Sequence, residues 1–242
     1  MNIRLPPYLT KLKSGNNLYA SQINPLNKEN KIMKRLTIED LQNYSTIRSN
    51  LIIRLVNKAN IPTDRVVLPI IDDIYATFGI LMEENYDSNA IVVITDKMLA
   101  DYGKTAMEIY NDALANLEKK YELKSMTEVL KEMCPDMSWL VGEDNNGMYV
   151  LTVKNKQNGA ACVLNRNIMD AVSRKINSKN IFIIPSSIHE VLIVDRDYFG
   201  DMTAEDVTDM IGSVNETEVA PNEVLSEHAY TYNYDYHCIS RA

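Results

Sequence analysis

Glycine-rich loops and paired cysteines are missing from this sequence. The 242 residues include only eight glycines, and neither GxGxxG nor GxxxxGK followed by Ser or Thr occurs. Those two loops, which hold nucleotide phosphates, are therefore excluded. The cysteines Cys134, Cys162 and Cys238 are odd in number and have no CxxC spacing. A disulfide framework is not expected, and we place the chain in the cytoplasm.

Long apolar runs are missing as well. No run approaches the ~20 residues of a membrane-spanning helix. The first residues contain Pro6, Pro7, Lys11 and Lys13 and lack the apolar stretch of a signal peptide. The net charge of −8 opposes binding to a phosphate backbone. We therefore expect no membrane insertion, no export and no nucleic-acid partner.

The sequence has ordinary globular proportions, with 45% hydrophobic and 24% charged residues. Its charge is unevenly spread, because residues 1–36 hold seven Lys or Arg and a single Glu. We expect a basic N-terminal arm over 1–36 and one acidic domain over 37–242. The arm either binds an anionic partner or folds back on its own domain.

Capping-box patterns mark several helix starts. In each, a hydroxyl can accept a bond from a free helix N–H while an acidic side chain three residues later reaches back. The pairs are Thr37 with Asp40, Thr105 with Glu108, Ser125 with Glu128, and Thr203 with Asp206.

Short runs rich in β-branched and aromatic residues predict strands, and polar turns between consecutive runs predict hairpins. The expected strands are Val66–Ile71, Tyr75–Met82, Ala90–Ile94, Met148–Val153, Ala160–Leu164, Asn180–Ile184 and Val191–Val194.

Offsetting the sequence by 70 residues aligns apolar strand positions and suggests a ββα repeat over residues 75–102 and 145–172. Hairpins interspersed with helices favour an α+β fold with a mixed, largely antiparallel sheet built from ββα-type units and covered by helices. A doubly wound parallel sheet fits the pattern less well.

Several phrases of the sequence, among them IIPSSIHEVLIV and VNETEVAPNEVLS, resemble an uncharacterised family of unknown function from anaerobic Gram-positive bacteria. The resemblance covers roughly residues 45–235. It implies membership of a family and no activity.

The strongest candidate for catalysis is the stretch Ser186, Ser187, His189 and Glu190. It offers a hydroxyl, an imidazole and a carboxylate, the groups of nucleophilic catalysis. In an extended segment Ser187 and His189 share a face, but there is no GxSxG turn to present the nucleophile. A turn between two strands, with His189 as a hydrogen-bonding strand residue, is the simpler interpretation.

Metal ligands are also present, without the usual spacing. His189, His228, His237 and Cys238 offer zinc-binding groups, yet no HxxxH or CxxC accompanies them. We expect no bound zinc and no other cofactor.

Acidic pairs are a second source of metal ligands. Asp72 with Asp73, and Asp195 with Asp197, could hold Mg²⁺. Exposed strand ends and turns explain these pairs more simply. Cys162 lies among apolar residues and is assigned to packing.

The most unusual stretch, residues 229–237, has tyrosine at every second position. In a strand, Tyr230, Tyr232, Tyr234 and Tyr236 would share one face. That face either packs on the domain or meets a partner, because tyrosine gives a large contact area at low entropic cost.

We therefore expect a non-catalytic protein-binding domain that uses the tyrosine face of the C-terminal strand, or a sheet edge near it, to bind another protein or a second copy of itself. The alternative is a hydrolase, metal-dependent or not, built around Ser187 and His189.

Overall fold

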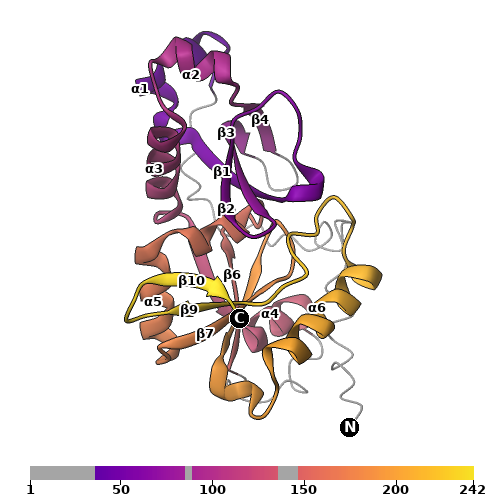
Figure 1. Cartoon of the computed structure of the whole chain (residues 1–242). Helices are drawn as coiled ribbons and strands as arrows, with labels where there is room; N and C mark the ends of the chain where they lie inside the picture. The colour runs from indigo at the N-terminus through magenta and orange to yellow at the C-terminus, as the bar shows by residue number, and fades with distance from the viewer. Residues whose placement is uncertain (1–35, 85–88, 136–146) are drawn as a thin grey trace.

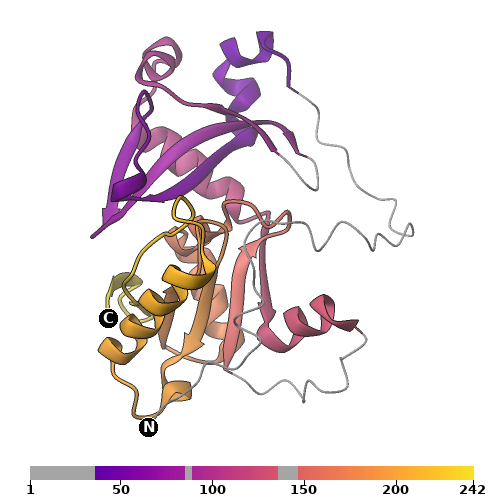
Figure 2. The ribbon, with the colours of Figure 1, turned by 90° about the vertical axis from the view of Figure 1, so that its right-hand side faces the viewer.

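A computed structural model of the chain describes residues 36–84, 89–135 and 147–242. The predicted basic arm, apart from Leu36, lies outside the described residues. The described strands form two antiparallel sheets, drawn mainly in purple and in orange in Figure 1. Figure 2 shows them stacked, with the N-terminal sheet above the C-terminal one. None of the described helices is long and apolar enough to cross a membrane.

The N-terminal sheet, called sheet A, is built around one long strand. β3 pairs along one edge with β1, and along the other edge with β2 and then β4. The tight turn between β2 and β3 contains Asp72, whose φ is +47°. The strands are β1 (Leu51–Asn57), β2 (Val67–Ile71), β3 (Ile74–Glu84) and β4 (Asn89–Val93).

Short helices surround sheet A, and one longer helix, α3, covers one of its faces. The buried residues of α3, Ile109, Ala113 and Leu117, follow each other at four-residue steps and form a single stripe toward β1. The helical elements are η2 (Glu39–Gln42), α1 (Tyr44–Ile47), η3 (Arg48–Asn50), η4 (Lys58–Asn60), α2 (Asp96–Tyr102) and α3 (Ala106–Leu117).

The C-terminal sheet, called sheet B, has the strand order β10-β9-β7-β8-β6-β5, and every pair is antiparallel. Its strands are β5 (Tyr121–Ser125), β6 (Met148–Val153), β7 (Asn180–Pro185), β8 (Val191–Asp195), β9 (Tyr230–Asn233) and β10 (Cys238–Arg241). Its helical elements are α4 (Met126–Met133), η6 (Gly159–Leu164), α5 (Arg166–Ile176), η7 (Arg196–Phe199) and α6 (Ala204–Glu218).

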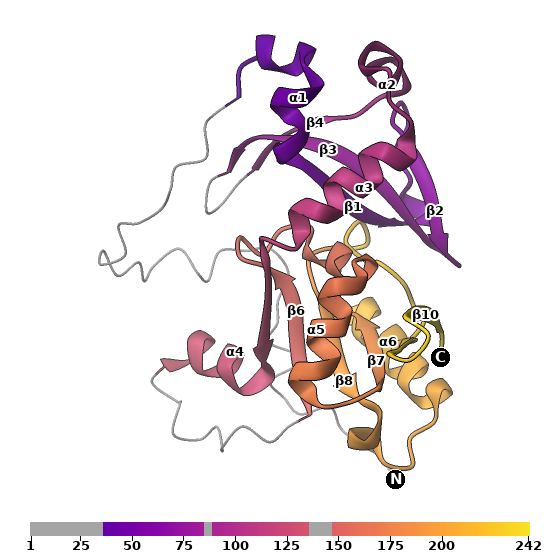
Figure 3. The ribbon, with the colours of Figure 1, turned by 90° about the vertical axis from the view of Figure 1, so that its left-hand side faces the viewer.

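Both faces of sheet B are buried. Along β7, Ile181 and Ile183 pack into the cluster that includes α5, whereas Phe182 and Ile184 pack into the cluster that includes α4 and α6. This explains why β7 and β8 are continuous apolar runs and do not alternate with polar residues. Figure 3 shows α3 along sheet A and α5 along sheet B on the same side of the molecule.

The two sheets share one core. A single cluster of buried side chains contains Ile53 and Phe78 of sheet A together with Ile183, Ile193 and Tyr230 of sheet B. Residues from the two halves of the chain are therefore packed against each other, with no water layer required between them.

The predicted α+β class is confirmed, and the helix starts are the most accurate part of the prediction. Thr105, Ser125 and Thr203 each form the complete capping box ahead of α3, α4 and α6. Thr37 exchanges the same bonds with Asp40 at the start of a short 3-10 helix.

One predicted strand is wrong. Ala160–Leu164 lies in the 3-10 helix η6, so residues 145–172 contain one strand before α5, whereas residues 75–102 contain β4, α2 and most of β3. The reason is that β6 is already flanked by β8 and β5, which leaves no edge for a following hairpin strand. The apolar run packs as a buried helical turn instead.

Candidate functional site

Sheet A meets two loops of sheet B at a polar contact that we call the junction. The loops are residues 186–190, between β7 and β8, and residues 219–229, between α6 and β9 (Figure 1). Asn57 at the end of β1 donates to the carbonyl of Leu225 at 3.1 Å, and Asn60 donates to the carbonyl of Pro221 at 2.8 Å. The longer loop is thus hydrogen-bonded to sheet A.

Asp73, in the β2–β3 turn, connects the two sheets at the junction. Its Oδ1 accepts from the hydroxyl of Ser226 at 2.9 Å and from that of Tyr230 at 3.0 Å, and its Oδ2 accepts from Asn57 at 2.8 Å. Burial and the nearby negative charge of Asp73 raise the pKa of Tyr230. All these groups have partners, so this part of the junction is structural.

Arg54 reaches the junction from β1. Leu51, Ile53 and Leu55 are buried in the core toward α3, so Arg54 projects from the opposite face of sheet A. There it is paired across the strands with Thr77 of β3, and Thr77 is paired in turn with Val67 of β2.

Arg65 is a second cation near Arg54. It directly precedes Val66, which is buried in the core and donates its N–H to Ile94. Arg65 itself lies in a bend outside the strands of sheet A, after Asp64 with its positive φ. The positive charge of Arg65 is close enough to lower the pKa of Arg54, after burial itself, which is the larger cause.

These two arginines lack the partners that buried arginines normally have. The Nε of Arg54 and the Nε of Arg65 are both buried without a hydrogen-bond partner. Among the described residues, no ion pair within 4.0 Å involves either guanidinium. Buried polar groups are nearly always paired, and an unpaired pair of like charges requires an explanation.

His189 and Glu223 face the arginines from the loops of sheet B. The Nδ1 of His189 accepts the N–H of Asn158 at 3.2 Å, which places the ring proton on Nε2. That Nε2 lies 3.7 Å from Oε1 of Glu223, too far for a hydrogen bond. Burial lowers the pKa of His189, Glu223 raises it, and Arg54 lowers it further. The imidazole is therefore a neutral N–H donor at neutral pH.

Besides the fully bonded Asp73, the junction brings Arg54, Arg65 and His189 near the carboxylate of Glu223. Guanidinium groups present N–H bonds in a fixed fork that matches the oxygens of carboxylates and phosphates. The arrangement can hold an oxyanion.

The pairing of Ser187 with the imidazole that the hydrolase alternative requires is not formed. The hydroxyl of Ser187 accepts the backbone N–H of His189 at 3.0 Å, which makes it part of a turn. Among the described residues, no hydrogen bond joins this hydroxyl to the ring nitrogens of His189, which face Asn158 and Glu223.

The tyrosine-rich segment does not present a four-ring face. β9 ends at Asn233, so only Tyr230 and Tyr232 lie on the strand, and both are 2% exposed. An exposed face that includes these two rings is therefore wrong, because they pack into the shared core. Tyr234 is half-buried, and Tyr236 is 80% exposed in the turn that follows.

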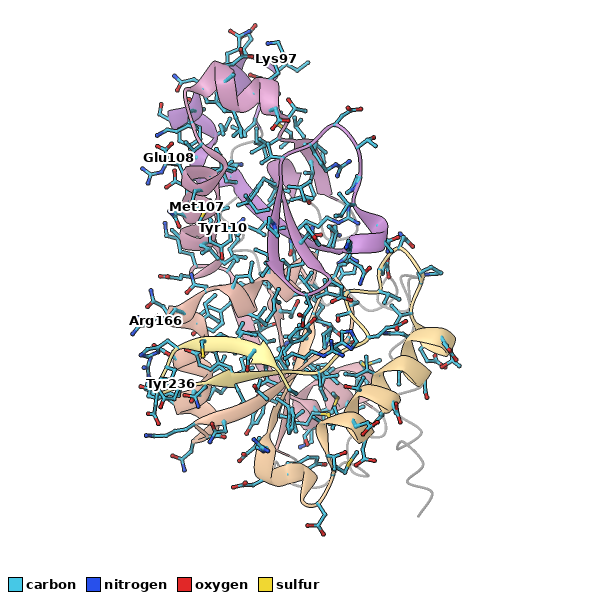
Figure 4. All side chains as sticks on the ribbon, viewed as in Figure 1. Lys97, Met107, Glu108, Tyr110, Arg166 and Tyr236 are labelled. Carbon is cyan, nitrogen blue, oxygen red and sulfur yellow. The ribbon has the colours of Figure 1, made fainter. Side chains whose placement is uncertain are left out.

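Tyr232 belongs to a second polar cluster, on the α5 side of the hairpin formed by β9 and β10. Its hydroxyl donates to Oδ1 of Asp170 at 2.5 Å, and Nδ1 of His237 lies 2.9 Å from the same oxygen. Burial and this carboxylate raise the pKa of Tyr232. Figure 4 shows Arg166 of α5 and Tyr236 at one margin of the molecule, on the side away from α6. The cluster fixes the hairpin to α5.

Comparison with known proteins identifies the family. The profile of DUF5688, a family of unknown function, matches residues 1–234. The chain belongs to the DUF5688 family. The resemblance to a family of unknown function is therefore confirmed. No curated protein and no solved structure matches the chain.

The side chains considered above as candidate metal ligands do not come together in the described part of this DUF5688 chain. Within residues 36–84, 89–135 and 147–242, no group of three or more His, Cys, Asp or Glu side chains could hold a metal ion. His189 lies at the junction and His237 beside Asp170, in separate clusters.

Sequence reasoning singled out His189 and missed Arg54, Arg65 and Glu223. The sequence does carry a signal for Arg54, which is the single charged residue of the otherwise largely apolar strand β1, LIIRLVN. Arg65 and Glu223 lie in loops and carry no comparable signal.

Proposed function

We propose that this DUF5688 chain is a non-catalytic binding domain that holds a small anion, through a carboxylate or phosphate group, at the junction. The proposal depends on one observation: Arg54 and Arg65, which lie close enough for their charges to interact, each bury an Nε without a hydrogen-bond partner.

The energetic argument starts from the cost of these donors. A buried donor left without a partner costs about 1–3 kcal/mol. Two neighbouring guanidinium groups add mutual repulsion, which the pKa of Arg54 reflects. An oxyanion would satisfy both donors and remove the repulsion. The free energy that the unpaired donors cost without a ligand is then recovered when an anion binds.

The position of the site also favours a binding role. Arg54 belongs to sheet A and Arg65 to the bend before β2, whereas His189 and Glu223 come from loops of sheet B. A ligand between them would join the two sheets and stabilise the folded state by mass action.

The experiment measures thermal unfolding against inorganic phosphate at constant ionic strength, with calorimetry for direct binding. The expected result is a midpoint that rises with phosphate in the wild type. The rise should be lost in Arg54→Gln and in Arg65→Gln. Lys58→Gln is the matched control, because Lys58 is an exposed cation just beyond β1. An equal response in all four proteins would contradict the proposal.

The hydrolase alternative is tested separately. The turn geometry of Ser187 supports a non-catalytic role, since its hydroxyl is engaged by the backbone of His189. A serine-reactive fluorophosphonate should leave Ser187 unmodified. Stoichiometric labelling of Ser187, lost in His189→Gln, would favour the hydrolase.

Self-association through the C-terminal hairpin is a second candidate function, favoured by the exposure of Tyr236. β10 is the last described strand of sheet B, so its outer edge is open to pairing with the same edge of a second copy. Tyr236, 80% exposed, lies in the turn that leads into it. Sedimentation should show a dimer that Tyr236→Ser weakens, with unfolding unchanged. A wild-type monomer at all concentrations contradicts this candidate.

A further inference from the structure

Glu223 is the acidic side chain of the junction that lies beside His189 and whose charge acts on Arg54. Its carboxylate lies within ion-pair distance of Nε2 of His189, at 3.7 Å. The side chain is 26% exposed. The Glu223 carboxylate therefore lies near the imidazole of His189 and near the guanidinium of Arg54, whose Nε has no partner.

The backbone holds Glu223 in this position. Its N–H donates to the carbonyl of Ala220 at 2.8 Å, and its own carbonyl accepts the N–H of Ile188 at 3.0 Å. The same loop is bonded to sheet A through Asn60 and Asn57. These bonds on both sides hold the main chain of Glu223 at the junction, so its side chain stays within reach of His189.

The carboxylate of Glu223 restricts the chemistry of the ligand. A simple anion would satisfy Arg54 and Arg65 but would be repelled by Glu223. A ligand that also carries a cationic N–H donor would satisfy the arginines with one end and Glu223 with the other. Charged hydrogen bonds of this kind are the stronger ones in proteins.

Building on the anion site of the proposed function, we propose that the ligand is an amino-carboxylate. Its carboxylate would lie against Arg54 and Arg65, and its ammonium group would donate to Glu223. The neutral Nε2–H of His189 would then be a further donor to the carboxylate end.

The test compares ligands that differ only in the amine. Acetate is matched with glycine, and propionate with β-alanine, so that the amine is offered at two distances from the carboxylate. Inorganic phosphate serves as the anion without an amine. Each is titrated at constant ionic strength against wild type, Glu223→Gln and Arg54→Gln, with ligand-dependent unfolding as the measurement. Glu227→Gln is the matched control, since Glu227 is an exposed glutamate of the same loop.

The expected result is that at least one amine-bearing ligand binds the wild type about tenfold more tightly than its amine-free match. Glu223→Gln should abolish this preference and leave phosphate binding as strong or stronger. Arg54→Gln should weaken every ligand, and Glu227→Gln should match the wild type.

Two outcomes overturn the proposal and separate it from the proposed function. If phosphate binds and Arg54→Gln removes that binding, but neither amine gives an advantage, the amino-carboxylate inference fails alone. The same holds if Glu223→Gln keeps the full preference for the amine-bearing ligand, because Glu223 then does not receive the ammonium group. If the wild type binds neither phosphate nor any carboxylate, both proposals fail.

Discussion

Replacing Arg54 by methionine should stabilise the protein when no anion is bound. The guanidinium of Arg54 has a buried Nε without a partner, a neighbouring positive charge and one compensating carboxylate, Glu223. Removing an unsatisfied buried donor recovers about 1–3 kcal/mol. Losing the attraction to Glu223 costs about 0.2–1 kcal/mol at a partly exposed site. Methionine keeps the apolar stem of the side chain, so packing changes little.

The net expectation is a gain of about 1–2 kcal/mol, which corresponds to about 2–8 °C in the unfolding midpoint of a chain of this size. The assay is thermal or urea unfolding in a buffer free of phosphate, sulfate and carboxylates. Arg48→Met is the control, because Arg48 is ion-paired with Asp112 at 2.6 Å on the surface and its loss should lower stability only slightly.

When an anion is bound, the wild type should become more stable to unfolding than Arg54→Met. A ligand at about 100 times its dissociation constant stabilises the wild type by about 2.7 kcal/mol, and the variant would not share this gain. The reasoning is refuted if Arg54→Met lowers stability by more than 1 kcal/mol in the anion-free buffer. That result would mean that the guanidinium supports the fold, as a paired structural arginine does.

Other predictions concern the folded framework. Gly159→Ala should cost roughly 1–3 kcal/mol in urea unfolding, because its new methyl group would lie 2.7 Å from the carbonyl oxygen of His189; an unchanged midpoint would contradict this close approach. Iodoacetamide at pH 8 should modify the exposed Cys238 and spare Cys162 until unfolding, since burial raises the pKa of the Cys162 thiol to about 12; peptide mass spectrometry would show early labelling of Cys162 if this is incorrect. Asp170→Asn should cost about 1–3 kcal/mol and increase hydrogen exchange in β9 and β10, whereas unchanged exchange would show that the hairpin is held by packing alone.

The accuracy of the sequence predictions depended on how local each feature is. Capping boxes use residues three positions apart, and Thr105, Ser125 and Thr203 start helices as predicted. The run Ala160–Leu164 was predicted as a strand because small apolar residues follow a turn. Its conformation is set instead by the neighbours of β6, which are distant in sequence.

The candidate site could be predicted only in part, for the same reason. His189 was recognised because imidazole is chemically conspicuous, but it was matched with Ser187, its neighbour in sequence. Its relevant neighbours are Glu223 and Arg54, which are contributed by other elements. An arginine in a strand resembles any solvated side chain until the pairing of the strands and the loop that faces them are known.

The bonds of Asp73 across the junction determine how the chain can be divided. A fragment ending after Leu117 would keep this carboxylate without the hydroxyls of Ser226 and Tyr230, and would expose the apolar side chains that face sheet B. The complementary fragment from Tyr121 would leave the same hydroxyls unpaired and its own share of the core open to water. We expect neither fragment to fold on its own, so recombinant expression and domain-swapping experiments should keep residues 36–242 together.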